Sequence, residues 1–157
     1  MECKLLVQVR MQERFPEAML LPGIFPDYGV VVEASAFGCP IIWNNNQPPS
    51  ARPAISNMKD VLRMKPINVR TAGLLPKAVE TYEYLFRHVN PCYIRDYGYL
   101  DGSVFLMGPV ETAAVIRGYS DFLLELYESP KLVHTLLTLV TDTLIAVSYT
   151  HLTLPTN

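Results

Sequence analysis

The feature that most limits the possible fold is an alternation of short apolar runs with helical segments. Residues 19–24 form an apolar run that enters a turn rich in proline and glycine, and Asp27 stands in that turn. Residues 30–38 have an apolar, partly helical pattern, and a second apolar run follows at residues 40–43. Strand, loop, helix and strand in this order predict a βα unit. In such units the reactive groups follow the carboxyl ends of the strands.

The remaining chain continues the alternation. Apolar spacing, together with proline and glycine stops, predicts helices at residues 4–14, 57–64, 76–89, 111–117, 121–127 and from residue 130 onward. Ser56 is the expected N-cap of the second of these helices. Residues 103–107 predict another buried strand, and residues 44–53 predict a polar, proline-rich loop.

This order of elements predicts an α/β domain with a parallel sheet. A complete (β/α)8 TIM barrel takes about 250 residues, whereas the chain has 157. We therefore expect a fragment of such a barrel over residues 1–147, with barrel residues missing before Met1 and after about Val147. Residues 148–157 are rich in threonine and depart from the apolar stripe of the preceding helix. We interpret them as a non-native read-through tail.

Charge and cysteine content exclude several classes of protein. The net charge of −2 provides no basic surface of the kind that binds nucleic acid or anionic membrane. No apolar run comes near the roughly 18 residues of a membrane span, and the amino end lacks a signal-peptide pattern. The three cysteines are widely separated, so the sequence indicates neither a disulfide framework nor a Cys-x-x-Cys metal site. We expect a cytoplasmic protein that binds neither nucleic acid nor membrane.

Asp27 is the main candidate for a functional residue. It lies beyond a predicted strand end, between the aromatic residues Phe25 and Tyr28. A carboxylate in this place could hold a cationic group or several N–H donors, and could stabilise developing positive charge. It could equally cap the short helix that follows, through the unpaired N–H groups of the first turn. The residue types alone leave both alternatives open.

Other polar positions favour structural roles. We predict a solvent-facing position for Glu33, with a buried partner as the alternative. Arg117 is expected at a helix C-terminus, where its charge complements the helix dipole. Gly108 and Pro109 are typical of a turn at a strand end, although a substrate contact is the alternative.

The two remaining ionisable candidates are His88 and His134, both on predicted helices. Neither has a His, Cys or acidic neighbour at the spacing of a metal site, so we expect no metal site within this chain. The sequence also contains no glycine-rich phosphate loop and no nucleophile elbow.

Several of these segments together resemble one family. Phe25-Pro26-Asp27, followed by residues 30–38, resembles the Phe-Ser-Asp strand end and Glu-Ala-x-Gly-type segment of uroporphyrinogen decarboxylases. Residues 105–109, then Arg117-Gly118, and residues 121–127 and 130–133 are similar to that family's Gly-Pro strand end and the helices after it. The likeness covers residues 15–147, and its specificity lies in the order and spacing of the segments.

The resemblance implies a (β/α)8 barrel and one of two enzymatic branches. One branch decarboxylates the acetate side chains of a tetrapyrrole, uroporphyrinogen, without a cofactor. The other passes a methyl group between a corrinoid protein and a small thiol at a zinc site. In the first branch the strand-end aspartate contacts the pyrrole N–H groups, and Asp27 matches that position. We take Asp27 as the candidate catalytic residue, and Phe25, Tyr28, Gly108 and Pro109 as candidate substrate-binding residues.

The chain departs from the family pattern in three places, and one of them, the missing tyrosine, favours the methyltransferase branch. The decarboxylase's arginine segment would lie before Met1, and residues 112–115 stand where its tyrosine is expected. The zinc-binding His and Cys of the methyltransferases would lie beyond Val147. The resemblance therefore implies a methyltransferase whose zinc and corrinoid partner are not held within this chain, which we expect to be inactive alone. Uroporphyrinogen decarboxylation and a non-catalytic binding role are the alternatives.

Overall fold

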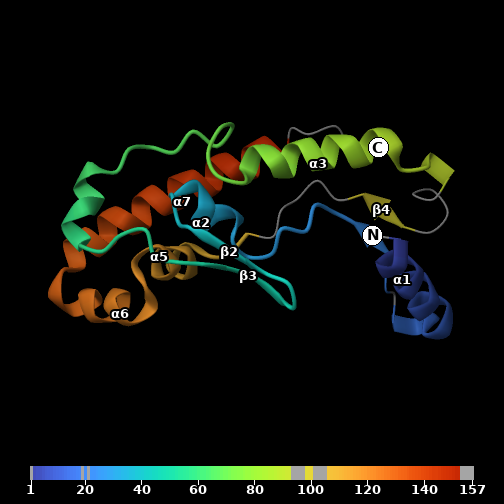
Figure 1. The fold of residues 1–157 in the computed structure, drawn as a ribbon, viewed down its shortest axis with the longest axis horizontal. Helices are drawn as coiled ribbons and strands as arrows, with labels where there is room; N and C mark the ends of the chain where they lie inside the picture. Colours follow the sequence, from blue (N-terminus) through green and yellow to red (C-terminus); the bar gives the residue numbers. More distant parts are fainter. Residues whose placement is uncertain (1, 19, 21, 93–97, 101–105, 153–157) are drawn as a thin grey trace.

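The computed structural model describes residues 2–18, 20, 22–92, 98–100 and 106–152 (Figure 1). Its elements, labelled as in Figure 1, are α1 (Glu2–Arg14), η1 (Pro16–Ala18), β1 (Gly23–Ile24), α2 (Val32–Ala36), β2 (Ile41–Asn44), β3 (Gln47–Ala51), η2 (Met58–Arg63), α3 (Leu75–His88), β4 (Tyr99–Leu100), α5 (Pro109–Arg117), α6 (Tyr119–Glu128) and α7 (Pro130–Leu152). The molecule is elongated, with α1 near one end and α6 near the other (Figure 1).

Strands β1 and β4 form a parallel pair, as the alternation of elements predicts. Gly23 is the partner of Tyr99, and Ile24 is the partner of Leu100. Parallel strands need a long connection, and the chain between these two contains α2, the β2–β3 pair and α3. Residues 19, 21 and 103–105 lie outside the described part of the chain, so most of the strand predicted at residues 103–107 does too.

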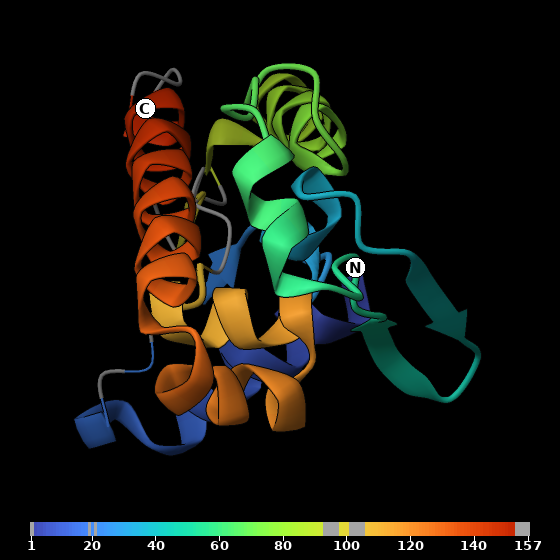
Figure 2. The ribbon, with the colours of Figure 1, turned by 90° about the vertical axis from the view of Figure 1, so that its left-hand side faces the viewer.

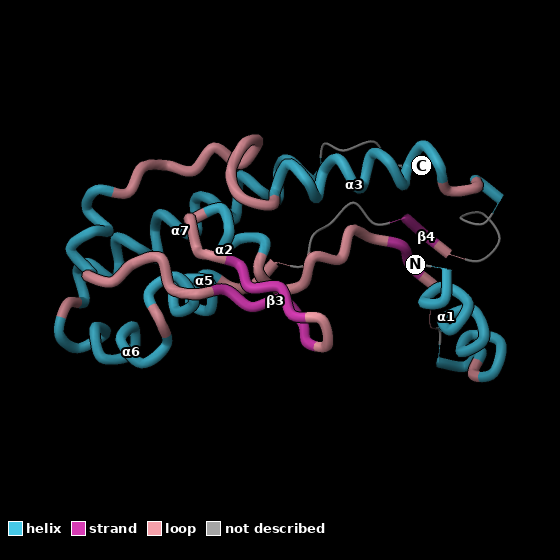
Figure 3. The backbone as a smooth tube through the Cα atoms, in the orientation of Figure 1, coloured by secondary structure: helices cyan, strands magenta, loops and turns pink. Residues whose placement is uncertain are grey.

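The second strand pair corrects the prediction for residues 40–53. Strand β2 was expected to continue a parallel sheet, but it pairs antiparallel with β3, as Figure 3 shows. The predicted loop is therefore wrong over Gln47–Ala51, because only Asn45 and Asn46 form a turn. Pro48 and Pro49 suggested a loop, but proline is tolerated on an edge strand, where its missing N–H faces no neighbour. The hairpin projects away from the helices (Figure 2).

The helices follow the local sequence closely. Helix α3 has Pro76 in its first turn, and α5 ends at Gly118, whose φ of 93° is the left-handed conformation that favours glycine at a helix end. The segment predicted as a helix at residues 57–64 is instead the 3-10 helix η2. Its cap is Asn57 rather than Ser56, because the Asn57 side chain accepts a hydrogen bond from the Lys59 N–H group.

The main hydrophobic core lies where α5, α6, α7 and η2 meet. Helix α7 packs against the other three, as Figures 1 and 2 show. The largest fully buried apolar side chains here include Ile116, Phe122, Leu136 and Val140. A smaller cluster joins α2, α3 and the end of α7, with Val32, Leu75 and Val147 among its members.

Among the described helices, α7 has the length and composition of a helix that could cross a membrane. Its mean hydropathy is 1.5 over Pro130–Thr150. The prediction that no apolar run comes near the length of a membrane span is therefore wrong for α7. One face of the helix is buried against α5, α6 and η2, through Val133, Leu136 and Val140. A helix with one face buried against its neighbours is common in soluble domains.

Helix α7 also continues beyond residue 147. It ends at Leu152, so the change of composition after residue 147 does not end the helix. The Ser148 and Thr150 hydroxyl groups donate to backbone carbonyls four residues earlier, at 2.9 Å in both cases. The non-native origin of residues 148–157 stays a prediction.

Candidate functional site

Asp27 lies on the loop between β1 and α2, and its side chain is exposed. Its Oδ1 atom accepts a hydrogen bond from the Gly29 N–H group at 3.2 Å. This Asx turn, two residues long, shapes the loop. The cap residue of α2 is Val31, which makes no side-chain cap bond. The Asp27 carboxylate therefore stabilises a turn in the loop and is not the N-cap of α2, the alternative that the sequence left open.

The two aromatic neighbours of Asp27 differ in their surroundings. The Tyr28 hydroxyl forms a hydrogen bond of 2.6 Å with the Thr81 hydroxyl of α3, and the Tyr28 ring packs on the smaller core cluster. Tyr28 thus anchors the loop to α3. The Phe25 side chain is exposed to 37%. Contact of these residues, or of Asp27, with a substrate stays a prediction.

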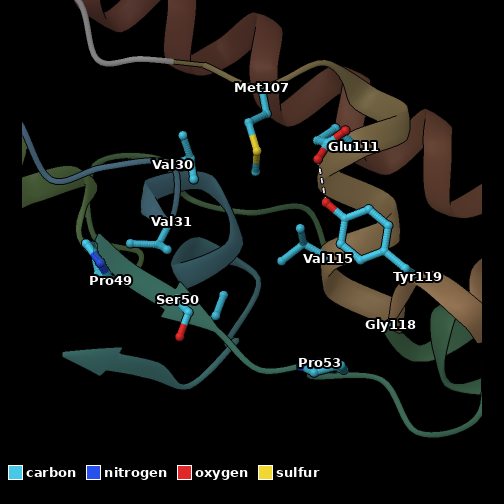
Figure 4. A pocket seen from close by; sticks show the side chains of 11 residues that line it. Val30, Val31, Pro49, Ser50, Pro53, Met107, Glu111, Val115, Gly118 and Tyr119 are labelled. Atoms are coloured by element: carbon cyan, nitrogen blue, oxygen red, sulfur yellow. Dashed lines mark hydrogen bonds between the residues drawn. The ribbon is translucent and has the colours of Figure 1, made fainter. Parts of the chain in front are cut away.

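A cavity of about 410 Å³ lies close to the predicted site residues (Figure 4). Its walls come from the loop before α2, from strand β3 and the residues after it, and from the start of α5 and of α6. The lining residues are Val30, Val31, Pro49, Ser50, Ala51, Pro53, Met107, Glu111, Val115, Gly118 and Tyr119. None of the predicted site residues is among them. However, Val30 follows the Asp27 loop directly, and Met107 precedes Gly108 and Pro109.

The polar groups of this cavity include a pair that sequence reasoning missed. The Tyr119 hydroxyl donates a hydrogen bond to Glu111 Oε1, and the pair lies along one wall (Figure 4). This bond to the carboxylate is the main reason that the pKa of Tyr119 is raised above its usual value. A separation of eight residues in the sequence does not by itself predict that the two side chains meet. The turn at Gly118 between α5 and α6 brings them together.

Glu33 is buried, which corrects its predicted solvent-facing position. Only 1% of the residue is exposed, because α2 is covered by α3 on one side and by α5 on another. Glu33 Oε1 accepts a hydrogen bond of 2.6 Å from the N–H group of Met107. Its other oxygen has no hydrogen-bond partner among the described residues. Burial raises the pKa of this carboxyl above its usual value, although backbone hydrogen bonds oppose the shift.

Arg117 stands at the predicted helix end, but its contacts go further than the helix dipole. Its Nε and Nη2 atoms bind the Glu125 carboxylate at 3.0–3.2 Å, and Nη1 binds Asp121 at 2.7 Å. Nη1 also donates to the Ile55 carbonyl at 3.4 Å. These bonds join α5 to α6 and to the segment before η2. The hydrogen bond to Glu125 is the main reason that the pKa of Arg117 is raised.

The zinc that the family resemblance implies does not fit the described residues. They contain no group of three His, Cys, Asp or Glu side chains placed to hold a metal ion. His88 bonds through Nδ1 to the Tyr84 carbonyl at 2.7 Å and stacks on the Tyr84 ring. His134 is exposed on α7. Burial raises the pKa of the Cys39 thiol to about 11, so this thiol stays protonated at neutral pH.

Comparison with known proteins assigns the family. The model of the uroporphyrinogen decarboxylase (URO-D) family matches residues 9–151, which is most of the chain. The chain belongs to the uroporphyrinogen decarboxylase family. No curated protein matches it closely enough to count as a relative.

A solved structure with a similar fold is a methyltransferase from Methanosarcina mazei. The TM-score is 0.60 with 18% sequence identity, and the match covers 93% of the present chain. The chain spans 42% of the length of that methyltransferase. At this identity the likeness concerns the fold. Together with the family assignment, it implies a TIM-barrel-like fold for this mixed α/β chain.

Proposed function

We propose that this URO-D family chain belongs to a methyltransferase that moves a methyl group from a corrinoid protein to a small thiol. The observation that carries the proposal is the charge of the cavity wall. Glu111 is its charged residue, and no Lys, Arg or His of the described chain lines it. Uroporphyrinogen carries many carboxylates, which such a wall would repel. A methyl group and a small thiol need no cationic partner.

The chain's own residues would bind and shield the reacting groups. Val30, Val31 and Met107 form an apolar surface that would exclude water from a bound methyl group. We assign to Asp27 a contact with the bound substrate from the neighbouring loop. The described residues provide no zinc site, so none of the roles that we assign to them involves zinc. The cysteine content suits a reducing compartment, and we propose a cytoplasmic location.

Decarboxylation of uroporphyrinogen is the second candidate, and one observation favours it. Asp27 is exposed on the loop that follows β1. A carboxylate has about four acceptor positions on its two oxygens, so it can accept more than one N–H bond, including those of a pyrrole. The substrate would then be a tetrapyrrole, without a corrinoid partner.

The experiment assays the gene product that contains this chain with methylcobalamin and 2-mercaptoethanol. Expected are loss of methylcobalamin and formation of the methyl thioether. Release of carbon dioxide from uroporphyrinogen would support decarboxylation instead. Turnover of neither substrate, with ligand binding retained, would support a non-catalytic binding protein and contradict both enzymatic proposals.

Two variants test Asp27 in the same assay. We expect Asp27→Ala to lower kcat/KM by about 100-fold, if its carboxylate stabilises charge in the reaction. Asp142→Ala is the matched control, because Asp142 is also exposed but lies on α7, away from the cavity. Equal activity and equal ligand affinity in both variants would leave Asp27 with its turn-forming role alone.

A further inference from the structure

The cavity contains a charged group placed against an apolar surface. Glu111 is exposed on α5, and its Oε1 atom already accepts a hydrogen bond from the Tyr119 hydroxyl group. A carboxylate can accept about four hydrogen bonds, so this bond leaves it able to bind a ligand. The Tyr119 side chain holds the carboxylate in one orientation at the wall of the cavity, opposite Val30 and Val31 (Figure 4).

The other walls determine the rest of the ligand. Val115 and Met107 face the cavity from the same side as the pair, with the hairpin residues Pro49 and Ser50 across from them (Figure 4). Such a wall fits an apolar body, and about 410 Å³ is within the usual size of small-molecule pockets. The aromatic ring of Tyr119 adds a surface that attracts cations.

We propose that this cavity binds a small ligand that carries a primary ammonium group on an apolar body, with Glu111 and Tyr119 as the recognition pair. The carboxylate would accept the ammonium protons, and the apolar wall would cover the hydrocarbon part. An anionic ligand of the same shape would be repelled. This assignment concerns binding and does not depend on methyl transfer, so a failed methyl-transfer assay leaves it standing.

Three probes of one shape and different charge test the proposal. Benzylammonium, benzyl alcohol and benzoate are titrated into the full chain, labelled with 13C at its methionine methyl groups. The Met107 methyl, identified by its loss in Met107→Leu, reports on the cavity, while Met58, buried in the core, reports on general effects. We expect a saturable shift of the Met107 resonance, with benzylammonium binding about five- to tenfold more tightly than benzyl alcohol. Benzoate should bind most weakly.

Two variants identify the charged partner. Glu111→Gln should remove the preference for benzylammonium over benzyl alcohol, and Tyr119→Phe should reduce it, since the carboxylate loses its fixed orientation. Glu80→Gln is the matched control, because Glu80 is exposed on α3 and does not line the cavity. Equal affinities for the cation and the alcohol, a preference that survives Glu111→Gln, or no Met107 shift with any probe would each overturn the proposal.

Discussion

The ion pair between Arg117 and Glu125 should hold α6 against α5. Its side chains are exposed to only 10% and 12%, and the contact is bidentate, with Arg117 Nε and Nη2 on the two carboxylate oxygens. Replacing Glu125 with alanine leaves the guanidinium nearly buried without its main partner. The perturbation therefore tests a charge that has lost its compensation, rather than a surface contact.

The expected cost follows from the burial of the pair. Removing one partner of a buried pair typically costs about 3–5 kcal/mol of the free energy of unfolding. Asp121 remains bonded to Arg117, but its side chain is exposed to 61%, and an exposed pair contributes at most about 1 kcal/mol. We therefore expect Glu125→Ala to cost roughly 2–4 kcal/mol. For a chain of this size, each kcal/mol lowers Tm by about 2–4 °C.

Urea unfolding, followed by circular dichroism at 222 nm, measures these changes. Asp121→Asn is the control and should cost less than about 0.5 kcal/mol, because that carboxylate is mostly in solvent. The double variant Arg117→Met with Glu125→Leu should recover most of the loss, since no charge is left buried. A Glu125→Ala variant as stable as Asp121→Asn would refute the reasoning.

Four further predictions concern other sites. Burial raises the pKa of Glu33 in the folded state above its ordinary value of 4.5, so the folded state binds this proton more tightly. The contribution of Glu33 to the free energy of unfolding is therefore fully present below the unfolded-state pKa. It is lost as the pH rises through the folded-state pKa. Glu33→Gln should remove that part of the pH dependence, and unchanged pH profiles would contradict this. Gly73→Ala should cost more than Gly38→Ala in thermal unfolding. Both positions have positive φ, and the backbone strain common to both is about 1–2 kcal/mol. Only at Gly73 would the added Cβ clash with other atoms, those of Ser35 and the Ala36 backbone, and equal costs would rule out this steric explanation. Glu33→Ala should shift the Met107 amide resonance, since it removes the acceptor of that N–H group, whereas Glu33→Gln should retain most of the native shift. The methyltransferase proposal predicts that sequencing of the source locus across the junction of residues 147 and 148 reveals a His-x-Cys segment with a later Cys. Continuation without these residues would favour decarboxylation or a binding role instead.

The sequence alone was sufficient for features that depend on neighbouring residues. The helix that begins near Pro76 and the one that ends at Gly118 were predicted within two residues at these ends, because proline and glycine act through their own backbone conformations. The order of apolar and polar segments was also enough to identify the family, which the match over residues 9–151 confirms. Family membership depends on the order of such segments, and that order is written in the chain.

Only the tertiary structure decided how distant residues meet. Glu33 was expected in solvent, but the packing of α3 and α5 around the short α2 buries it and places Met107 beside it. Strand β3 contains two prolines that locally favour a loop, and its pairing with β2 overrides that preference. Tyr119 and Glu111 meet across the turn between α5 and α6, and neither of the two residues specifies that turn. Burial and contact depend on the free energy of the whole packed chain, so no local pattern could predict them.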